Sequence, residues 1–399
     1  MATREITVGD GSAESSAAAH WSDLPDDLLG MVRSMVSSLR DRVRLAAVCK
    51  PWRGAASRLP APPAVPLLLL LVPNSDGKTG HLCGPDESWV LRVPDKAVVK
   101  NKLRMRFAGS HSNGWIAAVN NFQLVMVNLF SGSEVVAPTL RPGFLRQNPI
   151  TKIIFSQAPT SNGCMLATIT TGRLEVAVCK LGCRSGWTIK AWNEKFFTDI
   201  AFYDGDLYGL LHLTEELIKF TIGMEKDGTP VITAAHQVAI QTRDGPRLPY
   251  DPTYIFELHG KLAMAVRTQW LPNREHFFKV FNLGHVDTGE AYKNKWEEVT
   301  DFGEYALFLG PMCSMAVHVS VGAERRGLER NHIYYSSPTY SEESKLPGHK
   351  VYSMTVDNGD RCILMYCQED PDMGDGVKRT GYYIQGWRDN SMWIYPPYF

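Results

Sequence analysis

Apolar residues recur at helical spacing in a short stretch close to the N-terminus. Asp26 and Asp27 stand at its start, where carboxylates favour the dipole of a first helical turn, and Ser22 or Asp23 can cap that turn. The apolar positions lie three or four residues apart in two adjoining stripes, which comprise Leu28, Val32, Met35 and Leu39, with Leu29 and Val36 beside them. Two stripes are wider than one buried face needs, so the pattern predicts a helix with apolar surface to spare.

Two further short helices are expected directly after the first. One runs from Asp41 to Cys49, and Pro51 suits the first turn of another, which continues to Leu59. Residues 21–58 hold seven basic and four acidic side chains, which gives this segment a net charge of +3. A basic helical cluster with excess apolar surface suits a partner that is acidic and apolar.

Proline marks the boundary that follows the helices. Residues 59–65 include Pro60, Pro62 and Pro63, which make a semi-rigid linker. Residues 1–20 are rich in Ala, Ser and Gly, and we expect a disordered tail there. The sequence therefore predicts a tail, a three-helix module over 21–58, the linker and a large domain over 66–399.

The pattern from residue 66 onward is typical of β structure. Apolar or alternating runs such as PLLLLLV, WIAAV and MLATITT are separated by turns that contain glycine. Two segments resemble copies of one unit, since each has an aromatic residue ahead of a Gly-[Asp/Lys]-Leu sequence, and their glycines, Gly205 and Gly260, lie 55 positions apart. Such repeats predict a β-propeller, and about 330 residues give about six or seven blades. A large β-sandwich or barrel is the alternative.

The C-terminal sequence SMWIYPPYF is expected to close this propeller. Propellers often complete one blade with strands from both ends of the domain. We therefore expect Ser391–Phe399 to pair in the blade that PLLLLLV starts.

Composition and charge limit the possible partners. Of the 399 residues, 44% are apolar and 21% charged, as in soluble globular chains, and a net charge of 0 gives no basic field for nucleic acid. The longest apolar run, Val65–Pro73, is too short to span a membrane. The sequence shows no secretory signal, so we expect a nuclear or cytoplasmic protein with reduced thiols. Its eight cysteines lack metal-ligand spacing and are interpreted as buried apolar residues.

Motifs of catalysis are absent from the sequence. It has no Walker loop, no HExxH and no dinucleotide fingerprint. GSHSNG, from Gly109, does not match the GxSxG nucleophile elbow and is interpreted as a turn. EDPDMGD, from Glu369, lacks the spacing of a calcium loop and is interpreted as a solvated hairpin. We therefore expect no catalytic residue, no cofactor and no metal.

Two segments with Arg and aromatic residues are candidate recognition loops. QTRDGPRLPYDP, from Gln241, and RTQWLPNREH, from Arg267, carry the residue types that dominate protein-binding hot spots. The alternative is that they are ordinary connections between blades.

The sequence LPDDLL, followed by VRLAAVCKPWR, resembles an F-box, with its leading Leu-Pro, acidic pair and closing Val-Cys-Lys-x-Trp-Arg. F-boxes are three-helix modules that pack against the Skp adaptor of cullin–RING ubiquitin ligases. The resemblance implies that ten residues divide between the core of the module and the adaptor interface, namely Leu24, Pro25, Leu28, Leu29, Val32, Leu39, Leu45, Val48, Cys49 and Trp52.

The rest of the chain resembles the C-terminal domain of a large group of plant F-box proteins, a domain thought to be a kelch-like propeller. The matching pieces are PLLLLLVP, GSHSNGWIAAV, VNLFSGSEVVAP, DIAFYDGDLYGL and SMWIYPPYF. The group often has Asn-Pro where Leu129 and Phe130 stand here, so the chain departs from the pattern at this point.

The resemblance implies a non-catalytic substrate receptor of an SCF-type ubiquitin ligase. The F-box would bind the Skp adaptor, and through it cullin, while the propeller would hold an unidentified target protein for ubiquitination and proteasomal degradation. A second hypothesis is a scaffold or competitor that uses the same F-box outside an active ligase. A third is a propeller enzyme or sugar-binding module with a helical cap, which would show a catalytic or ligand cluster on one propeller face.

Overall fold

The structure is a computed structural model. It describes residues 21–36, 39–58, 65–74, 77–84, 90–93, 105–119, 123–138, 150–170, 175–183, 186–192, 196–212, 216–241, 253–270, 275–285, 294–319, 328–337, 350–355, 361–368, 377–384 and 391–396. The predicted tail over 1–20, most of the predicted linker and the EDPDMGD segment lie outside these ranges.

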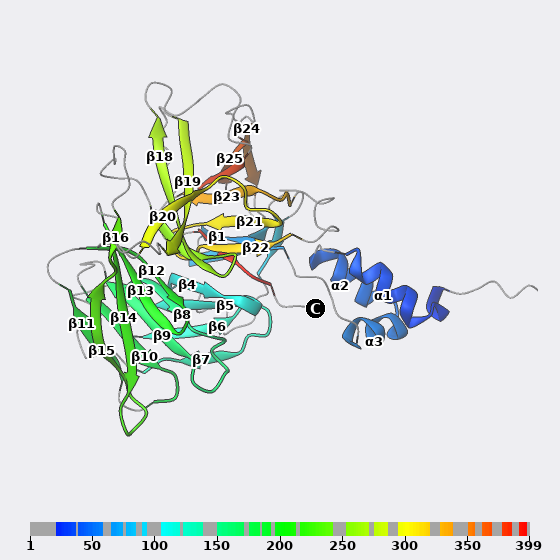
Figure 1. Ribbon diagram of the computed structural model, residues 1–399. Coiled ribbons are helices and arrows are strands. Elements are labelled where there is room, and N and C mark those ends of the chain that lie inside the picture. Colours follow the sequence, from blue (N-terminus) through cyan, green and yellow to red (C-terminus); the bar gives the residue numbers. More distant parts are fainter. Residues whose placement is uncertain are drawn as a thin grey trace, which may run out of the picture. The chain divides into compact units, whose positions relative to one another are not determined.

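The chain divides into two compact units, residues 1–62 with Phe399 and residues 63–398. The first unit contains the three expected helices (Figure 1). Its elements are η1 (Trp21–Asp23), α1 (Asp26–Ser34), α2 (Leu39–Ala47) and α3 (Lys50–Arg58). None of the described helices is long and apolar enough to cross a membrane.

The start of α1 differs from the prediction. Its N-cap is Pro25, which makes no side-chain capping bond, whereas Ser22 and Asp23 lie in η1. The proline ring holds Pro25 at φ −57°, and its ψ of 146° is extended backbone that separates η1 from α1. Asp26 and Asp27 do occupy the first turn, as expected. The second helix begins and ends two residues earlier than expected, and Pro51 lies in the first turn of α3.

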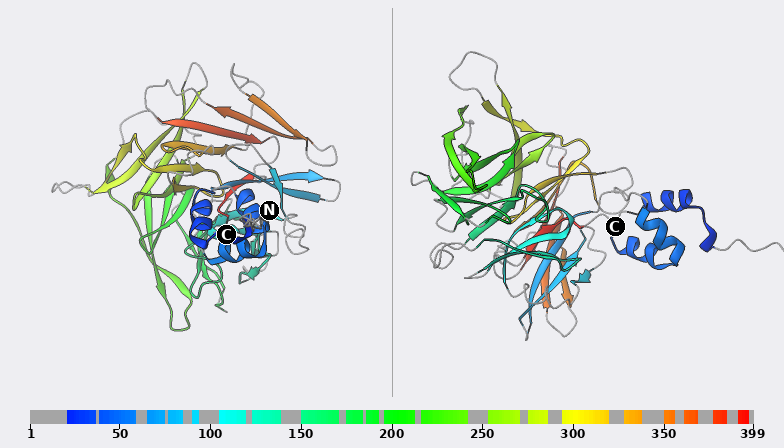
Figure 2. Two further views of the ribbon diagram at one scale, coloured as in Figure 1. Left: turned by 90° about the vertical axis from the view of Figure 1, so that its right-hand side faces the viewer. Right: turned by 90° about the horizontal axis from the view of Figure 1, so that it is seen from below.

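Four sheets of the second unit are four-stranded antiparallel blades, and a fifth sheet adds one edge strand to the same pattern. The first of these blades joins the two ends of the domain. Its strand order is β27-β1-β2-β3. The strands are β1 (Leu67–Asn74), β2 (Gly77–Cys83), β3 (Val90–Arg92) and β27 (Ser391–Ile394). Leu67 pairs with Ile394 and Leu70 with Ser391, which confirms the predicted closure of this blade (Figure 2, β27 in red and β1 in blue).

The next three blades follow one another along the chain, each with four strands in sequence order. One blade comprises β4 (Arg106–His111), β5 (Trp115–Val119), β6 (Leu124–Asn128) and β7 (Glu134–Val136), with η2 (Ser112–Gly114) between its first two strands. The next comprises β8 (Ile150–Phe155), β9 (Met165–Thr170), β10 (Glu175–Lys180) and β11 (Thr188–Ala191). The third comprises β12 (Phe197–Tyr203), β13 (Asp206–Leu211), β14 (Leu217–Met224) and β15 (Pro230–Gln237).

The fifth blade carries an additional edge strand. Its antiparallel strands are β17 (Thr253–Leu258), β18 (Lys261–Trp270), β19 (Glu275–His285) and β20 (Asn294–Val299). The short strand β16 (Ile240–Gln241) pairs in parallel with β20.

The sixth sheet is mixed and does not follow the blade pattern. Its order is β22-β21-β23-β26-β25-β24, and two of its pairings are parallel. The strands are β21 (Tyr305–Leu309), β22 (Met315–His318), β23 (His332–Ser337), β24 (Lys350–Thr355), β25 (Arg361–Gln368) and β26 (Lys378–Ile384). The described residues therefore form five regular blades, and the expected six or seven is wrong. The number of blades estimated from chain length is too high, because the strands between residues 305 and 384 form one six-stranded sheet and not separate four-stranded blades. A sandwich or single barrel does not fit these separate sheets.

Apolar clusters fill the spaces between neighbouring sheets. For example, Ile153 and Leu166 pack with Trp115 and Met126 of the preceding blade. Four further clusters join successive sheets in the same way, and the last combines the six-stranded sheet with β1, β2 and β27. Because both faces of a blade are covered, β5 and β6 are buried at every position and do not alternate.

The two predicted repeat segments are equivalent hairpins. The turn between β12 and β13 and the turn between β17 and β18 each contain two residues with positive φ, at Asp204-Gly205 (48° and 77°) and His259-Gly260 (53° and 68°). Two successive positive φ angles define the tight hairpin turn that suits the twist of antiparallel strands. These hairpins open the fourth and fifth regular blades, which explains the repeated sequence.

Candidate functional site

The three-helix unit has a very small core. Leu29 on α1 and Ala55 on α3 are its fully buried apolar residues within the described part of the unit. The indole N–H of Trp52 donates to the carbonyl of Trp21 at 2.9 Å, which holds η1 against α3. The guanidinium of Arg58 lies 2.7 Å from the Asp26 carboxylate and links α3 to the start of α1.

An apolar stripe on α1 faces solvent. Leu28, Met31, Val32 and Met35 follow one another at positions i, i+3, i+4 and i+7, and they are 46%, 63%, 38% and 57% exposed. Val48, just after α2, is 57% exposed. Among the described residues, nine large apolar side chains are exposed, and six of them lie between Trp21 and Val48. Soluble proteins rarely leave such a group uncovered unless it binds a partner.

The ten residues predicted from the sequence fall into different environments. Leu29 is buried in the core. Four are half-buried, namely Leu24, Leu45, Cys49 and Trp52, and four are exposed, namely Pro25, Leu28, Val32 and Val48. The backbone of Leu39 starts α2, and its side chain is outside the described structure. Their roles in adaptor binding stay a prediction.

The ten predicted site residues leave out two members of the stripe, of which Met35 was placed in the helical pattern and Met31 was not. Met31 and Met35 complete the exposed row with Leu28 and Val32, and methionine is well suited to adaptable binding surfaces. The spacing of three residues from Leu28 was the available signal for Met31, and it places Met31 on the same face as Met35.

A second candidate site lies in the propeller, at the ring formed by the first strands of its blades. Strand β8 contacts both β4 and β12, β17 contacts β12 and β22, and β27 contacts β4. A pocket of about 440 Å³ opens at this ring, lined by residues of β4, β8, β12, β17, β21 and β22 together with Tyr395. The pocket therefore draws on most of the sheets, which no single sequence motif could indicate.

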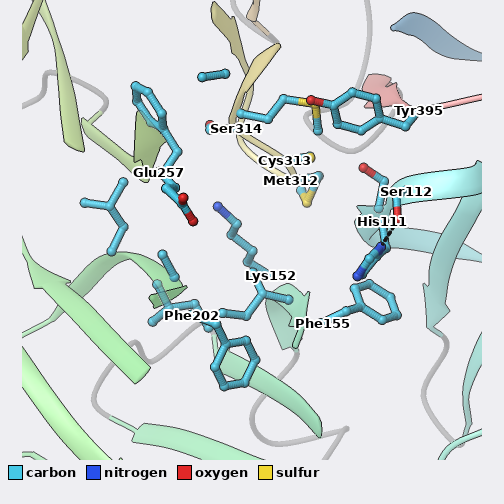
Figure 3. A pocket seen from close by; sticks show the side chains of 18 of the residues that line it. His111, Ser112, Lys152, Phe155, Phe202, Glu257, Met312, Cys313, Ser314 and Tyr395 are labelled. Atoms are coloured by element: carbon cyan, nitrogen blue, oxygen red, sulfur yellow. Dashed lines mark hydrogen bonds between the residues drawn. The ribbon is translucent and has the colours of Figure 1, made fainter. Parts of the chain in front are cut away.

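The pocket combines apolar and polar walls (Figure 3). Lys152 points its amine into the space, between Glu257 and Phe202 on one side and His111 and Phe155 on the other. The imidazole of His111 lies 5.5 Å from the ring of Phe155 in an edge contact. This mixture can accept a segment of another protein or a small organic molecule of mixed polarity.

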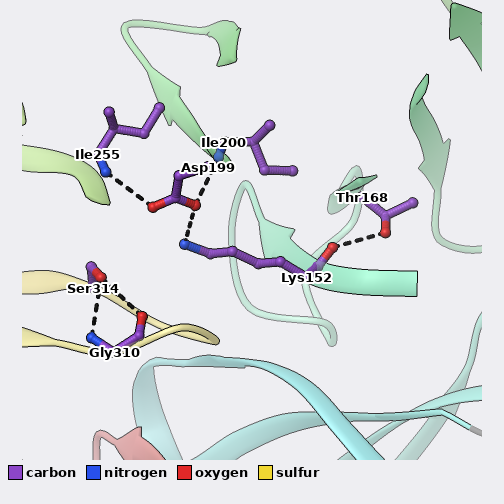
Figure 4. Close-up of polar contacts among 7 residues, drawn as sticks. All are labelled: Lys152, Thr168, Asp199, Ile200, Ile255, Gly310 and Ser314. Atoms are coloured by element: carbon purple, nitrogen blue, oxygen red, sulfur yellow. Dashed lines mark hydrogen bonds and ion pairs between the residues drawn. The ribbon is translucent and has the colours of Figure 1, made fainter. Parts of the chain in front are cut away.

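Lys152 and Asp199 form a buried ion pair at the base of this pocket (Figure 4). The Lys152 amine lies 2.5 Å from Asp199 Oδ1, and both side chains are at most 4% exposed. The carboxylate also accepts backbone N–H bonds from Ile200 at 2.8 Å and from Ile255 at 3.0 Å. Burial raises the pKa of Asp199, and the Lys152 ammonium opposes that shift. The pair joins β8, β12 and β17, so it fixes three neighbouring inner strands.

The described pocket residues do not assemble a nucleophile with its base and orienting acid. The Ser112 hydroxyl lies 2.7 Å from His111 Nδ1, but the described structure shows no carboxylate on that imidazole. Burial lowers the pKa of His111 and raises the pKa of the Cys313 thiol to about 11, so this thiol is protonated at neutral pH. Across the described residues, no group of His, Cys, Asp and Glu could hold a metal ion.

The motifs singled out in the sequence have different outcomes. The second half of GSHSNG, Ser112–Gly114, is the expected turn before β5, whereas its first three residues belong to strand β4. A side chain at Gly109 would collide with the backbone of Ile153 on the neighbouring β8. Ser110, His111 and Ser112 of this motif line the pocket, which the interpretation as a turn missed. QTRDGPRLPYDP lies almost entirely outside the described residues, and RTQWLPNREH is described only where it ends β18 and begins β19.

The point of departure at Leu129 and Phe130 has a local explanation in the structure. The two residues form the turn after β6, in which the Asn128 side chain accepts the N–H of Phe130 at 3.0 Å. A side chain at Gly114 would collide with the Phe130 ring, so the ring covers this glycine. The four-stranded blade β4–β7 therefore forms although the turn has Leu-Phe in place of Asn-Pro.

Two family models match the chain. One is described as KIB1-4 beta-propeller and matches residues 84–365, and the other is described as F-box-like and matches residues 21–59.

Proteins of Arabidopsis thaliana are similar to the chain. F-box protein At2g26160 is 46% identical over 347 residues, which cover 79% of this chain and 95% of that protein. F-box/kelch-repeat protein At1g57790 is 22% identical over 391 residues, with 94% of this chain and 95% of that protein covered. F-box protein At3g56470 is 29% identical over 150 residues, so the match spans 37% of each chain.

Solved structures resemble the fold only distantly. TolB from Acinetobacter baumannii has a TM-score of 0.37 and 10% sequence identity, and the match covers 89% of this chain and 73% of that chain.

Proposed function

Because the chain belongs to the family of F-box proteins that carry a KIB1-4 beta-propeller, we propose that it is a substrate receptor of an SCF-type ubiquitin ligase. The three-helix unit binds the Skp adaptor and, through it, cullin. The propeller binds a target protein, which is then ubiquitinated and degraded by the proteasome. The protein acts in the nucleus or the cytoplasm, where ligases of this type operate.

The observation that carries this proposal is the exposed apolar stripe of α1. Leu28, Met31, Val32 and Met35 leave apolar surface in water that a folded partner can bury, at roughly 25 cal/mol per Å² of area covered. Among the described apolar side chains of the three-helix unit, Leu29 and Ala55 are the fully buried ones, and the stripe takes no part in that packing. The net charge of +3 over residues 21–58 favours an adaptor with an acidic, apolar groove.

The proposed mechanism is proximity. A target held on the propeller meets the ubiquitin-loaded enzyme as part of the same assembly, at a high effective concentration. The protein needs no catalytic group for this role. The pocket at the inner strands, with Lys152, Glu257 and Phe202 in its wall, is the proposed place of target binding because it is concave and combines apolar, polar and charged side chains.

Adaptor binding is tested by replacing Leu28 and Val48 together by Asp. Two carboxylates placed in an apolar interface lose their hydration without gaining partners, so the complex with a recombinant Skp adaptor should be lost. Isothermal titration calorimetry with the full chain measures the change. Met224→Asp is the control, because Met224 is also exposed (51%) but belongs to β14 of the propeller.

An unchanged Kd for the double variant, with its helical circular dichroism intact, would contradict adaptor binding through this surface. A reconstituted ligase then separates a receptor from a scaffold or competitor with the same F-box. If the protein is a receptor, the ligase assembled with it transfers ubiquitin to targets found by proximity labelling under proteasome inhibition. A scaffold or competitor binds the adaptor without raising target turnover.

A further inference from the structure

The three-helix unit contains a second hollow besides its apolar stripe. Arg33 of α1, Arg42 of α2 and Arg53 of α3 line a pocket of about 290 Å³. The other described lining residues are apolar, namely Leu45, Ala46, Ala47 and Ala56. Three guanidinium groups thus share a pocket whose described lining contains no acidic residue.

Arg33 lies on the buried side of α1, one turn after Leu29. It is only 5% exposed, and its Nε is buried without a hydrogen-bond partner in the described structure. Burial lowers the pKa of this guanidinium, because the charged form loses hydration. A buried cation without a counter-charge is unfavourable, so the site gains free energy when an anion enters.

The hydrogen bonds described for the two other arginines of the pocket go to neutral backbone carbonyls. Arg42 Nε donates to the carbonyl of Val36 at 2.9 Å, and Arg53 Nε donates to the carbonyl of Ala46 at 3.3 Å. The ion pairs described within the unit lie outside the pocket lining. They join Asp26 to Arg58 and Asp41 to Arg44, and all four of these side chains are at least half exposed.

We propose that this pocket receives a carboxylate side chain, Asp or Glu, of the adaptor that covers the three-helix unit. A guanidinium is a planar fork that binds a carboxylate through two parallel hydrogen bonds. Alanine and leucine walls lower the local dielectric, which strengthens such a pair. The adaptor is the occupant that fits, because the unit is basic and its apolar stripe already requires a partner. This inference rests on the proposed function and adds the ionic contact that would orient the adaptor.

Arg33→Gln in the full chain tests the contact. The Kd for a recombinant Skp adaptor from Arabidopsis thaliana should rise about tenfold or more, because the adaptor carboxylate would be left buried without its charged partner. The loss should also be smaller at high salt, where charge contributes less. Arg44→Gln is the matched control, since Arg44 lies on α2 outside the pocket and its side chain is 62% exposed. It should leave the Kd unchanged.

Arg33→Met separates charge from packing, because methionine keeps an apolar stem in place of the arginine stem. A Kd equal to that of the wild type for folded Arg33→Met or Arg33→Gln would overturn the inference while the proposed function stands. If the wild-type chain does not bind the adaptor at all, the proposed function is wrong, and so is the inference that an adaptor carboxylate enters this pocket. Arg33→Glu, combined in turn with Lys replacements of the adaptor's acidic residues, should restore binding for one pair and so identify the carboxylate.

Discussion

At the scale of single residues, the pair of Lys152 and Asp199 shows how a charged group becomes part of the propeller core. Both side chains are almost completely buried, and the carboxylate has three donors from three inner strands. A satisfied pair of this kind adds little net stability, but removal of one partner leaves a buried charge. The pair therefore fixes the geometry of the pocket above it.

Lys152→Met should lower the free energy of unfolding of the propeller by about 3 kcal/mol or more at neutral pH. Urea denaturation followed by circular dichroism measures this change. Lys279→Met is the control, because its pair with Glu298 is about half exposed, and a loss of less than about 1 kcal/mol is expected there. Equal losses for the two variants would contradict the structural role of Lys152.

The pH dependence of that variant follows from the raised pKa of Asp199. Without the ammonium, the folded-state pKa rises further above the unfolded value, so the folded chain binds the proton more readily than the unfolded chain. Protonation removes the unpaired charge as the pH falls. The deficit of Lys152→Met relative to the wild type should therefore shrink between neutral pH and about pH 4.

At the scale of elements, the tight hairpin turns set the register of the blades. Asp204-Gly205 and His259-Gly260 both need positive φ at two successive residues, and a Cβ added at either glycine would meet no atom within 4 Å. Any cost of a side chain at these glycines is therefore backbone strain and not a collision. The same turn chemistry made the two hairpins recognisable as repeats in the sequence.

Gly260→Ala should lower the free energy of unfolding by about 1 kcal/mol, since a Cβ disfavours the left-handed conformation. Gly260→Asn is the control, because asparagine tolerates that conformation in spite of its larger side chain. The two variants are compared by urea denaturation. A smaller loss for alanine than for asparagine would show that strain at positive φ does not determine this turn.

At the scale of the whole propeller, the pairing of β1 with β27 closes the ring. Trp393 of β27 is fully buried, packs against Phe308 and Tyr382, and donates its indole N–H to the carbonyl of Leu309 at 3.1 Å. Ser110 of β4 donates to the carbonyl of Trp393 at 2.7 Å. This one strand therefore contacts the first blade, the second blade and the six-stranded sheet.

Deletion of Ser391–Phe399 should lower the thermal midpoint by at least about 5 °C, because it leaves a cavity at Trp393 and an unpaired edge on β1. Differential scanning calorimetry of the full chain and the deletion variant measures the shift. Deletion of residues 2–20, the tail predicted from the sequence, should leave the midpoint unchanged. An unaltered midpoint without β27 would mean that closure does not stabilise the ring.

The sequence by itself determined the elements, because their signals are local. Helical spacing after Asp26, proline after the helices and glycine at tight turns each act within a few residues, and they predicted three helices followed by β-strands. The F-box pattern was equally local. The prediction of a propeller rested on the similar sequences around Gly205 and Gly260. The prediction that its first blade is completed by the C-terminal strand rested on the sequence SMWIYPPYF.

The tertiary structure decided what each of those elements faces. Leu28 and Leu29 are neighbours of the same type, yet one is 46% and the other 2% exposed, because only packing with α3 selects the buried side of α1. Helical periodicity gave no reason to place Arg33 on that side. Lys152 and Asp199 form an ion pair although they lie 47 positions apart in the sequence. The number of blades was decided by the six strands between residues 305 and 384 that pair into one sheet. These outcomes depend on contacts between distant segments, which local patterns do not encode.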